Sequence, residues 1–533
     1  WTFREQPKFF DVVTYTGNGS NRTIAHNLGT TVGMMLVKLT SGTDGWAVYH
    51  RGVDNSAPED YRLRLDGTNA RIDNTDGSRW NRTAPTSSVF SLGTDGSVNA
   101  NGETYVAYLF AHNNDDGGFG VAGDQDIIKC GSYTGNGSTT GVFQDLGFEP
   151  QWIISKNSGL TEPWVMLDNK RGVGGAGSND PRLVANGNNA EAGGEIMQFN
   201  ATGFTPLTAD DKINGNNYIY VYMAIRRGGM QTPTAASSVF QPHIYTGDES
   251  TRVYDLNITP DMVINISRTE NGDAKAINTR MTENEHELYV SGADSSYDAS
   301  SGSQGMQFDH TKKIEIQSYR YTDGNTYLNL CWARAKGFFD ILVTKSLDSQ
   351  VTHNLGVAPE IVLYKRRDAT SDWFFCTGVD GFGKINTDAA FTGTQNGAGT
   401  GSNLANATAT NVYGGSVFVG GADRDMVIYL FATAAGVSKV GSFTQNGATN
   451  VACGFTGSTP ALIILKRTDS SGGWYAFDSS RGIVAGNDKS VFLNDTAVEV
   501  TNADIVDPYS GGFATTSSLT NGSYIFYAIA SIA

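Results

Sequence analysis

Short apolar runs, separated by clusters of Gly, Asn, Asp, Ser and Thr, set the pattern of this chain. In two kinds of run the residues at odd and even positions are both apolar, which predicts central strands covered on both faces of a sheet. A third kind, such as GWAVYHRG at 45–52, alternates and predicts a strand with one solvated face. Asn-Gly and Asp-Gly pairs supply tight turns, and no segment sustains a helical period. The pattern therefore predicts an all-β protein of two-layer antiparallel sandwiches.

The same runs recur five times. The first kind follows Gly33 in the first copy and a proline in the others: Pro150, Pro260, Pro359 and Pro460. Fourteen residues beyond these prolines lie, in order, Trp164, Ala274, Trp373 and Trp474. In the first copy, Trp46 lies thirteen residues beyond Gly33. Each copy closes with a seven-residue run that ends in Ala, such as YVAYLFA from Tyr105.

Each copy contains roughly a hundred residues, a normal size for one β-sandwich domain. The sequence thus predicts five tandem antiparallel β-sandwich-like domains, numbered here as repeats 1 to 5. Their predicted bounds are 9–111, 126–228, 238–334, 338–433 and 438–533. Repeat 3 is degenerate, because it lacks the Trp. A linker at 112–125 separates repeats 1 and 2. The linker at 229–237 and the shorter connectors between the later repeats are predicted to hold neighbours end to end with little freedom.

Residues 1–8 resemble the junction between repeats 3 and 4. The series Trp1, Phe9, Phe10, Asp11 is matched by the series Trp332, Phe338, Phe339, Asp340. We therefore expect 1–8 to be the end of an upstream repeat followed by a connector.

Composition narrows the function classes. The formal net charge of −16 and the pI of about 4.9 oppose binding to nucleic acid and to anionic membranes, so neither partner is expected. No apolar run approaches the roughly 18 residues that a membrane span needs, so no membrane insertion is expected. The four cysteines are scattered without a CxxC pair, which indicates neither a zinc site nor a disulfide framework.

Motifs for catalysis or cofactors fail on their context. GFGVAG at 118–123 fits a dinucleotide fingerprint but leads into a predicted strand instead of a helix. GVDGFGKI at 378–385 lacks the hydroxyl of a phosphate loop, and ENEHEL around His286 lacks a second histidine. The acidic segment 113–118 has two interpretations, a Ca²⁺ site or a solvated linker. We expect no catalytic residue, no cofactor and no metal site.

The repeated tryptophans have two interpretations. An aromatic ring presented once per repeat could stack on a sugar, which makes Trp46, Trp164, Trp373 and Trp474 candidate glycan contacts. A Trp at fixed register beside a central strand is also typical of core packing, with its N–H satisfied locally. The loops 73–88 and 392–411 are free to vary, and recognition usually lies in loops on a rigid scaffold.

Four segments carry a family resemblance: WTFREQPKFFDVVTYTGNGSNRTIAHNLG, TAPTSSVFSLGTDGSVNANGETYVAYLFAHN, IIKCGSYTGNGS and YVYMAIRRGGMQTP. Together they resemble a family of tandem repeat domains of unknown function found in tail-fibre proteins of marine phages, those of cyanobacteria and related bacteria. Repeats 1 and 2 match well, whereas repeats 4 and 5 keep only the scaffold.

The resemblance implies a noncatalytic virion structural protein, a tail fibre or adhesin on the virion surface. Expected partners are other virion proteins and a host-surface glycan or protein, and phage fibres are often homotrimers. Two alternatives stay open at this stage: a capsid-attached fibre or decoration protein, and a fibre-borne polysaccharide depolymerase.

Overall fold

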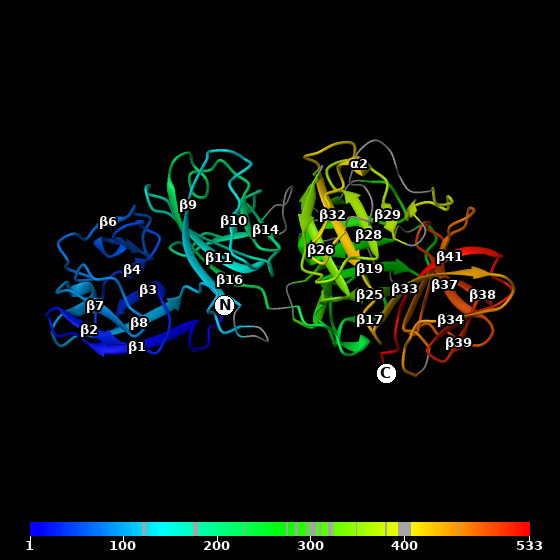
Figure 1. Cartoon of the computed structure of the whole chain (residues 1–533), viewed down its shortest axis with the longest axis horizontal. Helices are drawn as coiled ribbons and strands as arrows, with labels where there is room; N and C mark the ends of the chain where they lie inside the picture. The colour runs from blue at the N-terminus through cyan, green and yellow to red at the C-terminus, as the bar shows by residue number, and fades with distance from the viewer. Residues whose placement is uncertain are drawn as a thin grey trace. The chain divides into compact units, whose positions relative to one another are not determined.

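The structure is a computed structural model of the whole chain (Figure 1). It describes residues 1–119, 123, 125–173, 180–228, 230–272, 275–282, 286–294, 297–298, 305–308, 311–317, 322, 324–347, 349–378, 381–392, 407–457 and 459–532. Ala274, part of the linker 112–125 and most of the loop 392–411 therefore lie outside the described residues. The chain forms two compact units, Trp1–Asn169 with Asn179–Gly229, and Lys170–Ser178 with Met230–Ala533.

Repeat 1 consists of a large and a small antiparallel sheet. The large sheet has the order β1 (Phe10–Thr16), β8 (Thr104–Ala111), β3 (Val32–Leu39), β4 (Ala47–His50), β5 (Tyr61–Arg64), β6 (Ile72–Asp73). The small sheet pairs β2 (Arg22–Ala25) with β7 (Val89–Leu92). Short helical turns η1 (Pro58–Asp60) and α1 (Gly96–Asn99) lie between strands.

Repeats 2 and 3 repeat this plan. In repeat 2 the large sheet has the order β13 (Arg182–Val184), β12 (Trp164–Asp168), β11 (Pro150–Asn157), β16 (Ile219–Arg226), β9 (Ile128–Thr134), and the small sheet contains β10 (Gln144–Asp145), β15 (Gly203–Pro206), β14 (Met197–Asn200). In repeat 3 the large sheet has the order β17 (Phe240–Thr246), β25 (Thr326–Trp332), β19 (Met262–Ser267), β20 (Ala276–Thr279), β21 (His286–Tyr289), β22 (Tyr297–Asp298), and the small sheet contains β18 (Arg252–Asp255), β24 (Lys313–Ile316), β23 (Met306–Gln307). The turns η2 (Ala236–Ser238) and η3 (Arg280–Thr282) belong to repeat 3.

Repeats 4 and 5 follow the same order. In repeat 4 the large sheet has the order β26 (Phe339–Lys345), β32 (Asp425–Phe431), β28 (Ile361–Arg366), β29 (Phe374–Thr377), β30 (Gly381–Lys384), and the small sheet pairs β27 (Gln350–Thr352) with β31 (Asn411–Tyr413), with α2 (Ser416–Val419) following. In repeat 5 the large sheet has the order β33 (Ser438–Gln445), β41 (Gly522–Ile529), β35 (Leu462–Arg467), β36 (Trp474–Asp478), β37 (Asp488–Phe492), β38 (Val500–Ala503), and the small sheet contains β34 (Thr449–Ala452), β40 (Gly512–Thr515), β39 (Val506–Tyr509).

Each large sheet has five common positions, in the hydrogen-bonded order opening, closing, central, Trp and outer strand. The opening strands are β1, β9, β17, β26 and β33, and the closing strands are β8, β16, β25, β32 and β41. The central strands are β3, β11, β19, β28 and β35. The Trp strands are β4, β12, β20, β29 and β36, and the outer strands are β5, β13, β21, β30 and β37. The predicted all-β, sandwich-like class is confirmed.

The central strands carry apolar side chains on both faces because each face has its own partner. In β28, Val362 and Tyr364 belong to a cluster that includes Val412 of the small sheet. Ile361 and Leu363 belong to a second cluster that continues into repeats 3 and 5. One face is therefore the core of the sandwich, and the other is an interface between repeats.

The prediction of a Trp strand with one solvated face is wrong. All four residues of β4 are buried, as are all four of β20. His50 of β4 is 1% exposed, and its Nε2 lies 3.0 Å from the backbone oxygen of Tyr222 in repeat 2. The polar residue that suggested a solvated face instead contacts the next repeat.

Repeats 1 and 2 form one pair, and repeats 3, 4 and 5 form one trio. A single cluster of buried side chains runs through the pair, and another runs through the trio. Within the trio, repeat 3 also meets repeat 5, where the Glu499 amide donates to the Arg268 oxygen at 3.0 Å. The three repeats therefore close on one another, which corrects the expectation of an end-to-end row. The predicted repeat bounds themselves stay a prediction.

Strand register corrects two positions of the sequence alignment. Val32 pairs with Ala111 as Pro150 pairs with Arg226, and each is followed by the same bulge. Val32, not Gly33, therefore occupies the proline position, and Trp46 follows it by fourteen residues as in the other copies.

Repeat 3 contains one extra residue before its Trp strand. Thr279 pairs with Met262 as Thr377 pairs with Ile361. Counting four residues back from Thr279 places Lys275, not Ala274, at the Trp position of repeat 3.

Candidate functional site

Three of the four repeated tryptophans lie in contacts between consecutive repeats. Trp164, Trp373 and Trp474 are at most 2% exposed. Each indole N–H donates to a backbone oxygen in the outer strand of the preceding repeat. The bonds run from Trp164 to Arg64 at 2.7 Å, from Trp373 to Tyr289 at 2.8 Å and from Trp474 to Lys384 at 3.1 Å. A buried ring with a satisfied N–H offers no free face for a sugar.

A buried lysine accompanies the Trp in the two consecutive contacts of the trio. Lys365 Nζ donates to the oxygens of Ala293 in repeat 3 at 3.0 Å and of Ser371 at 2.6 Å. Lys466 Nζ likewise donates to Asp388 of repeat 4 at 2.9 Å and to Gly472 at 2.5 Å. Each ammonium lies 5.8 Å from the ring centroid of its own Trp. Burial lowers the pKa of both lysines to about 8.

The backbone adds one more equivalent bond at each contact. The Ser371 amide donates to the Ala293 oxygen at 2.7 Å, and the Gly472 amide donates to the Asp388 oxygen at 2.8 Å. Where repeat 3 meets repeat 5, the Gly272 amide donates to the Thr496 oxygen at 3.1 Å. Ala293, Asp388 and Thr496 each lie four residues beyond the matching position of the outer strand. The trio therefore has three related contacts.

The third contact uses charge where the others use an indole. Lys275 is buried at the Trp position, and its Nζ donates to the oxygens of Asp495 at 2.5 Å and Ala497 at 3.1 Å. Beside it, the Arg268 guanidinium donates to both carboxylate oxygens of Glu499 at 2.9 and 3.1 Å. An ammonium and a two-pronged ion pair thus replace the missing Trp.

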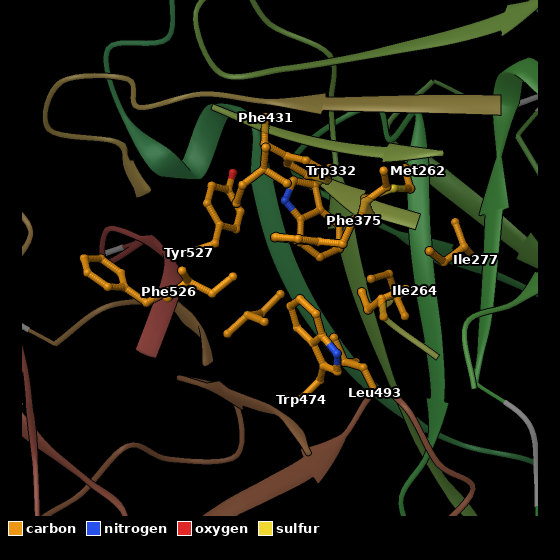
Figure 2. A pocket seen from close by; sticks show the side chains of 15 residues that line it. Met262, Ile264, Ile277, Trp332, Phe375, Phe431, Trp474, Leu493, Phe526 and Tyr527 are labelled. Atoms are coloured by element: carbon orange, nitrogen blue, oxygen red, sulfur yellow. The ribbon is translucent and has the colours of Figure 1, made fainter. Parts of the chain in front are cut away.

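The faces of the three repeats enclose a small apolar cavity of about 50 Å³. Figure 2 shows Trp332, Phe375, Trp474 and Tyr527 gathered around it. Pockets for small molecules generally have volumes of about 300 to 1,000 Å³, so this space is a packing void at the centre of the trio. The cavity therefore offers no room for a sugar.

Trp46 differs from the other three tryptophans. Its ring is half-buried and packs on Tyr108, with the centroids 6.0 Å apart and the planes at 27°. The structure thus distributes the four candidate tryptophans over separate positions and brings none of them into a shared glycan site. Only Trp46 keeps part of its ring accessible.

The histidine of HNLG, a sequence that occurs at 26–29 and again at 353–356, has a structural role. His26 Nδ1 accepts the Leu28 amide at 3.2 Å, and Nε2 lies 3.2 Å from the Thr86 oxygen. Burial lowers the pKa of His26, which favours the neutral ring that this pattern requires. His353 accepts the Leu355 amide in the same way. Both rings fix turns.

The described residues contain no group of three or more His, Cys, Asp or Glu side chains that could hold a metal ion. In the acidic segment 113–118, Asp116 accepts the Asn114 amide at 3.0 Å and the Thr30 hydroxyl at 2.8 Å. The cysteines are all buried and unpaired, and burial raises the pKa of each thiol. In the part of the chain that the structure describes, no helix is long and apolar enough to cross a membrane.

The lysine of these contacts was not predicted, although the sequence carries a signal for it. Lys38, Lys156, Lys365 and Lys466 each lie eight residues before the repeated Trp. Repeat 3 has Ile266 at the register position of this lysine. The Lys and Trp spacing thus marks repeats 1, 2, 4 and 5, of which repeats 2, 4 and 5 make the Trp contact.

The fold and the contacts together define a class of protein with tandem β-repeats. Within each unit, consecutive repeats dock through a hydrogen bond from a Trp indole to a backbone oxygen of the preceding repeat. The chain belongs to the family described as Domain of unknown function (DUF7483), whose model matches residues 5–227 and 339–532. The first segment covers repeats 1 and 2, and the second covers repeats 4 and 5. No curated protein and no solved structure matches the chain.

Proposed function

We propose that this chain is a noncatalytic structural protein of a virion surface, a fibre or adhesin that contacts the host cell. The resemblance of its landmark segments to repeats of phage tail fibres supports the setting. The Trp-to-backbone contact supports the mechanical role, because it joins repeats into blocks in three places. This contact is the observation that carries the proposal.

A fibre must hold its contact points at fixed spacing from its attachment point. Blocks whose repeats share buried cores resist bending better than repeats joined only by flexible linkers. Several repeats on one particle also multiply weak contacts with the host through a high effective concentration. The repeats of this chain suit such a role, with a host-surface glycan or protein as partner.

The loop 73–88 of repeat 1 is our candidate contact with the host. Trp80 anchors it, since the ring is 1% exposed and its N–H donates to the Tyr61 oxygen at 3.1 Å. Arg82 donates twice to Asp60, at 3.0 and 2.9 Å. The exposed part of the loop, with Ala84 and Ser87, is therefore presented from a fixed base.

Binding of the purified chain to host cells tests the proposal. The double change Ala84→Arg and Ser87→Arg adds bulk and charge at exposed positions without touching the anchors, and we expect it to lower binding several-fold. Ser517→Arg, at an exposed position of repeat 5, serves as the matched control and is expected to bind normally. Equal binding by all three proteins would remove this loop from the proposal.

Three measurements separate the remaining versions of the proposal. Antibody labelling of assembled particles distinguishes a tail fibre from a capsid-attached fibre. Incubation with host polysaccharide, followed by an assay for new reducing ends, would reveal a depolymerase and overturn the noncatalytic proposal. The mass of the purified protein in solution tests the expected homotrimer.

A further inference from the structure

The half-buried face of repeat 1 matches a covered face of repeat 4. Trp46 and Tyr108 lie 6.0 Å apart at 27°, and Trp373 and Tyr429 lie 5.9 Å apart at 29°. The strand register is also the same, because Tyr108 pairs with Leu36 as Tyr429 pairs with Leu363. The two repeats thus present the same aromatic pair at the same position of the large sheet.

The two faces differ in what covers them. Trp373 and Tyr429 are both 0% exposed, and the outer strand β21 of repeat 3 accepts the Trp373 indole N–H. Trp46, Tyr108 and Leu36 are each half-buried. Among the described residues, the Trp46 indole N–H has no hydrogen-bond partner. Repeat 1 therefore has the donor half of a contact without the acceptor half.

The acceptor half is also open in the pair. In repeat 2 the outer strand β13 pairs Val184 with Val165, as β5 pairs Arg64 with Ala47. Arg64 accepts the indole of Trp164, whereas no described indole reaches Val184. The pair thus has one unused donor face and one unused outer strand. In the trio the equivalent surfaces are both occupied, because a third repeat closes the arrangement.

We propose that the Trp46 face docks one further repeat of this family, which precedes repeat 1 in the same polypeptide. A backbone oxygen of that repeat's outer strand accepts the Trp46 N–H, and its own Trp strand lies against β13. The pair then becomes a second trio. This inference concerns assembly and is independent of the proposed function.

The connector before repeat 1 identifies the source of the third repeat. Gln6 and Phe10 form the same bridge as Ala335 and Phe339, which link repeat 3 to repeat 4. The Lys8 amide donates to the Leu28 oxygen at 2.7 Å, and the Gly337 amide donates to the Leu355 oxygen at 2.7 Å. Both residues have a positive φ, 64° at Lys8 and 75° at Gly337. The connector that joins docked repeats in the trio therefore also leads into repeat 1.

A second copy of the chain fits this face less well. A second copy would add its own repeats 1 and 2 to the first pair. Four repeats would then have to fit an arrangement that three repeats already close in the trio. A single repeat satisfies both open surfaces without such a conflict.

Hydroxyl-radical footprinting with mass spectrometry tests the proposal residue by residue. The two samples are the 533-residue chain and the polypeptide translated from the complete natural reading frame. In the 533-residue chain, Trp46 and Tyr108 should be oxidised several-fold faster than Trp373 and Tyr429, which serve as internal controls. In the complete polypeptide, Trp46 and Tyr108 should become as protected as these controls.

Two results would overturn the proposal. One is a reading frame without a preceding repeat, and the other is unchanged oxidation of Trp46 in the complete polypeptide. Trp46→Phe provides a second readout, because it keeps an aromatic ring, although a smaller one, and removes the N–H donor. In the complete polypeptide this variant should raise Tyr108 oxidation several-fold, and in the 533-residue chain it should leave Tyr108 oxidation unchanged.

Discussion

The contact of repeat 5 with repeat 4 and the contact of repeat 3 with repeat 5 have the same geometry and different chemistry. The first places Trp474 against Lys384 and buries a large apolar ring. The second places Lys275 and Arg268 against the segment 495–499 and neutralises charges. The comparison teaches that the backbone contact defines the arrangement, whereas the side chain at the Trp position sets how the contact responds to pH and salt.

The largest effect is expected for Trp474→Ala. Removing a buried Trp side chain typically lowers the free energy of unfolding by about 3 to 5 kcal/mol. Urea denaturation of the chain should show this loss, and hydrogen exchange should rise in β30 and β36. Trp474→Phe, which removes the N–H donor and shrinks the ring but keeps an aromatic side chain, should lose less than Trp474→Ala. Equal losses for both variants would show that the ring itself contributes little.

Glu499→Gln should have the next largest effect. It leaves the Arg268 and Arg481 guanidinium groups without their shared carboxylate in a mostly buried site, at a cost of about 2 to 3 kcal/mol. Asp66→Asn is the matched control, because its ion pair with Arg64 is exposed and is worth less than about 1 kcal/mol. Urea denaturation of both variants at neutral pH measures the difference.

The same contact should weaken in acid. Burial alone would raise the pKa of Glu499, but the hydrogen bonds from Arg268 and the charge of Arg481 hold this pKa below its ordinary value of 4.5. The ion pair thus contributes stability above pH 4.5, and this contribution is lost as the pH falls through the lower pKa of the folded state. Exchange at the contact of repeats 3 and 5 should therefore rise before exchange at the contact of repeats 4 and 5.

Lys466→Met should change the response to alkali more than the stability at neutral pH. Burial lowers the pKa of Lys466 to about 8 in the folded chain, against an ordinary value of 10.5. Between these values the unfolded chain binds more protons, so this lysine makes the free energy of unfolding rise with pH. The difference in stability between the parent and Lys466→Met should therefore shift in favour of the parent between pH 8 and about 9.5. A constant difference over that interval would contradict the burial argument.

Trp46→Ala should give the smallest effect in the 533-residue chain. Its ring is half-buried and its N–H has no partner among the described residues, so we expect a loss of about 1 kcal/mol or less. Urea denaturation beside Trp474→Ala makes the comparison direct. A loss as large as that of Trp474→Ala would mean that the open face is already fully used.

The strands of each repeat could be predicted from local pattern, because the alternation of apolar side chains follows directly from the pleat of a strand. The contacts between repeats could not, because they depend on which faces meet in three dimensions. His50 illustrates this limit: a polar residue in an alternating run suggested solvent, and the neighbouring repeat supplied its partner.

The candidate tryptophans show the same division. Their fixed register predicted a shared environment, and core packing was one of the two interpretations. That the N–H would reach another repeat was not visible, because the acceptor is backbone and leaves no trace in the sequence. Lys275 was missed for another reason, since a single inserted residue shifts the alignment of repeat 3 by one position.

The residues that accept the tryptophans are an arginine, a tyrosine and a lysine. The hydrogen bond uses only the main-chain oxygen, so the accepting position needs no particular side chain, although the Trp474 ring also packs on Phe375 and Phe391 of repeat 4. A change of the residue at the accepting position therefore leaves the acceptor of the Trp hydrogen bond in place. Duplication, loss or exchange of whole repeats by recombination thus preserves the joint, and the length of the array can evolve separately from the surfaces it displays.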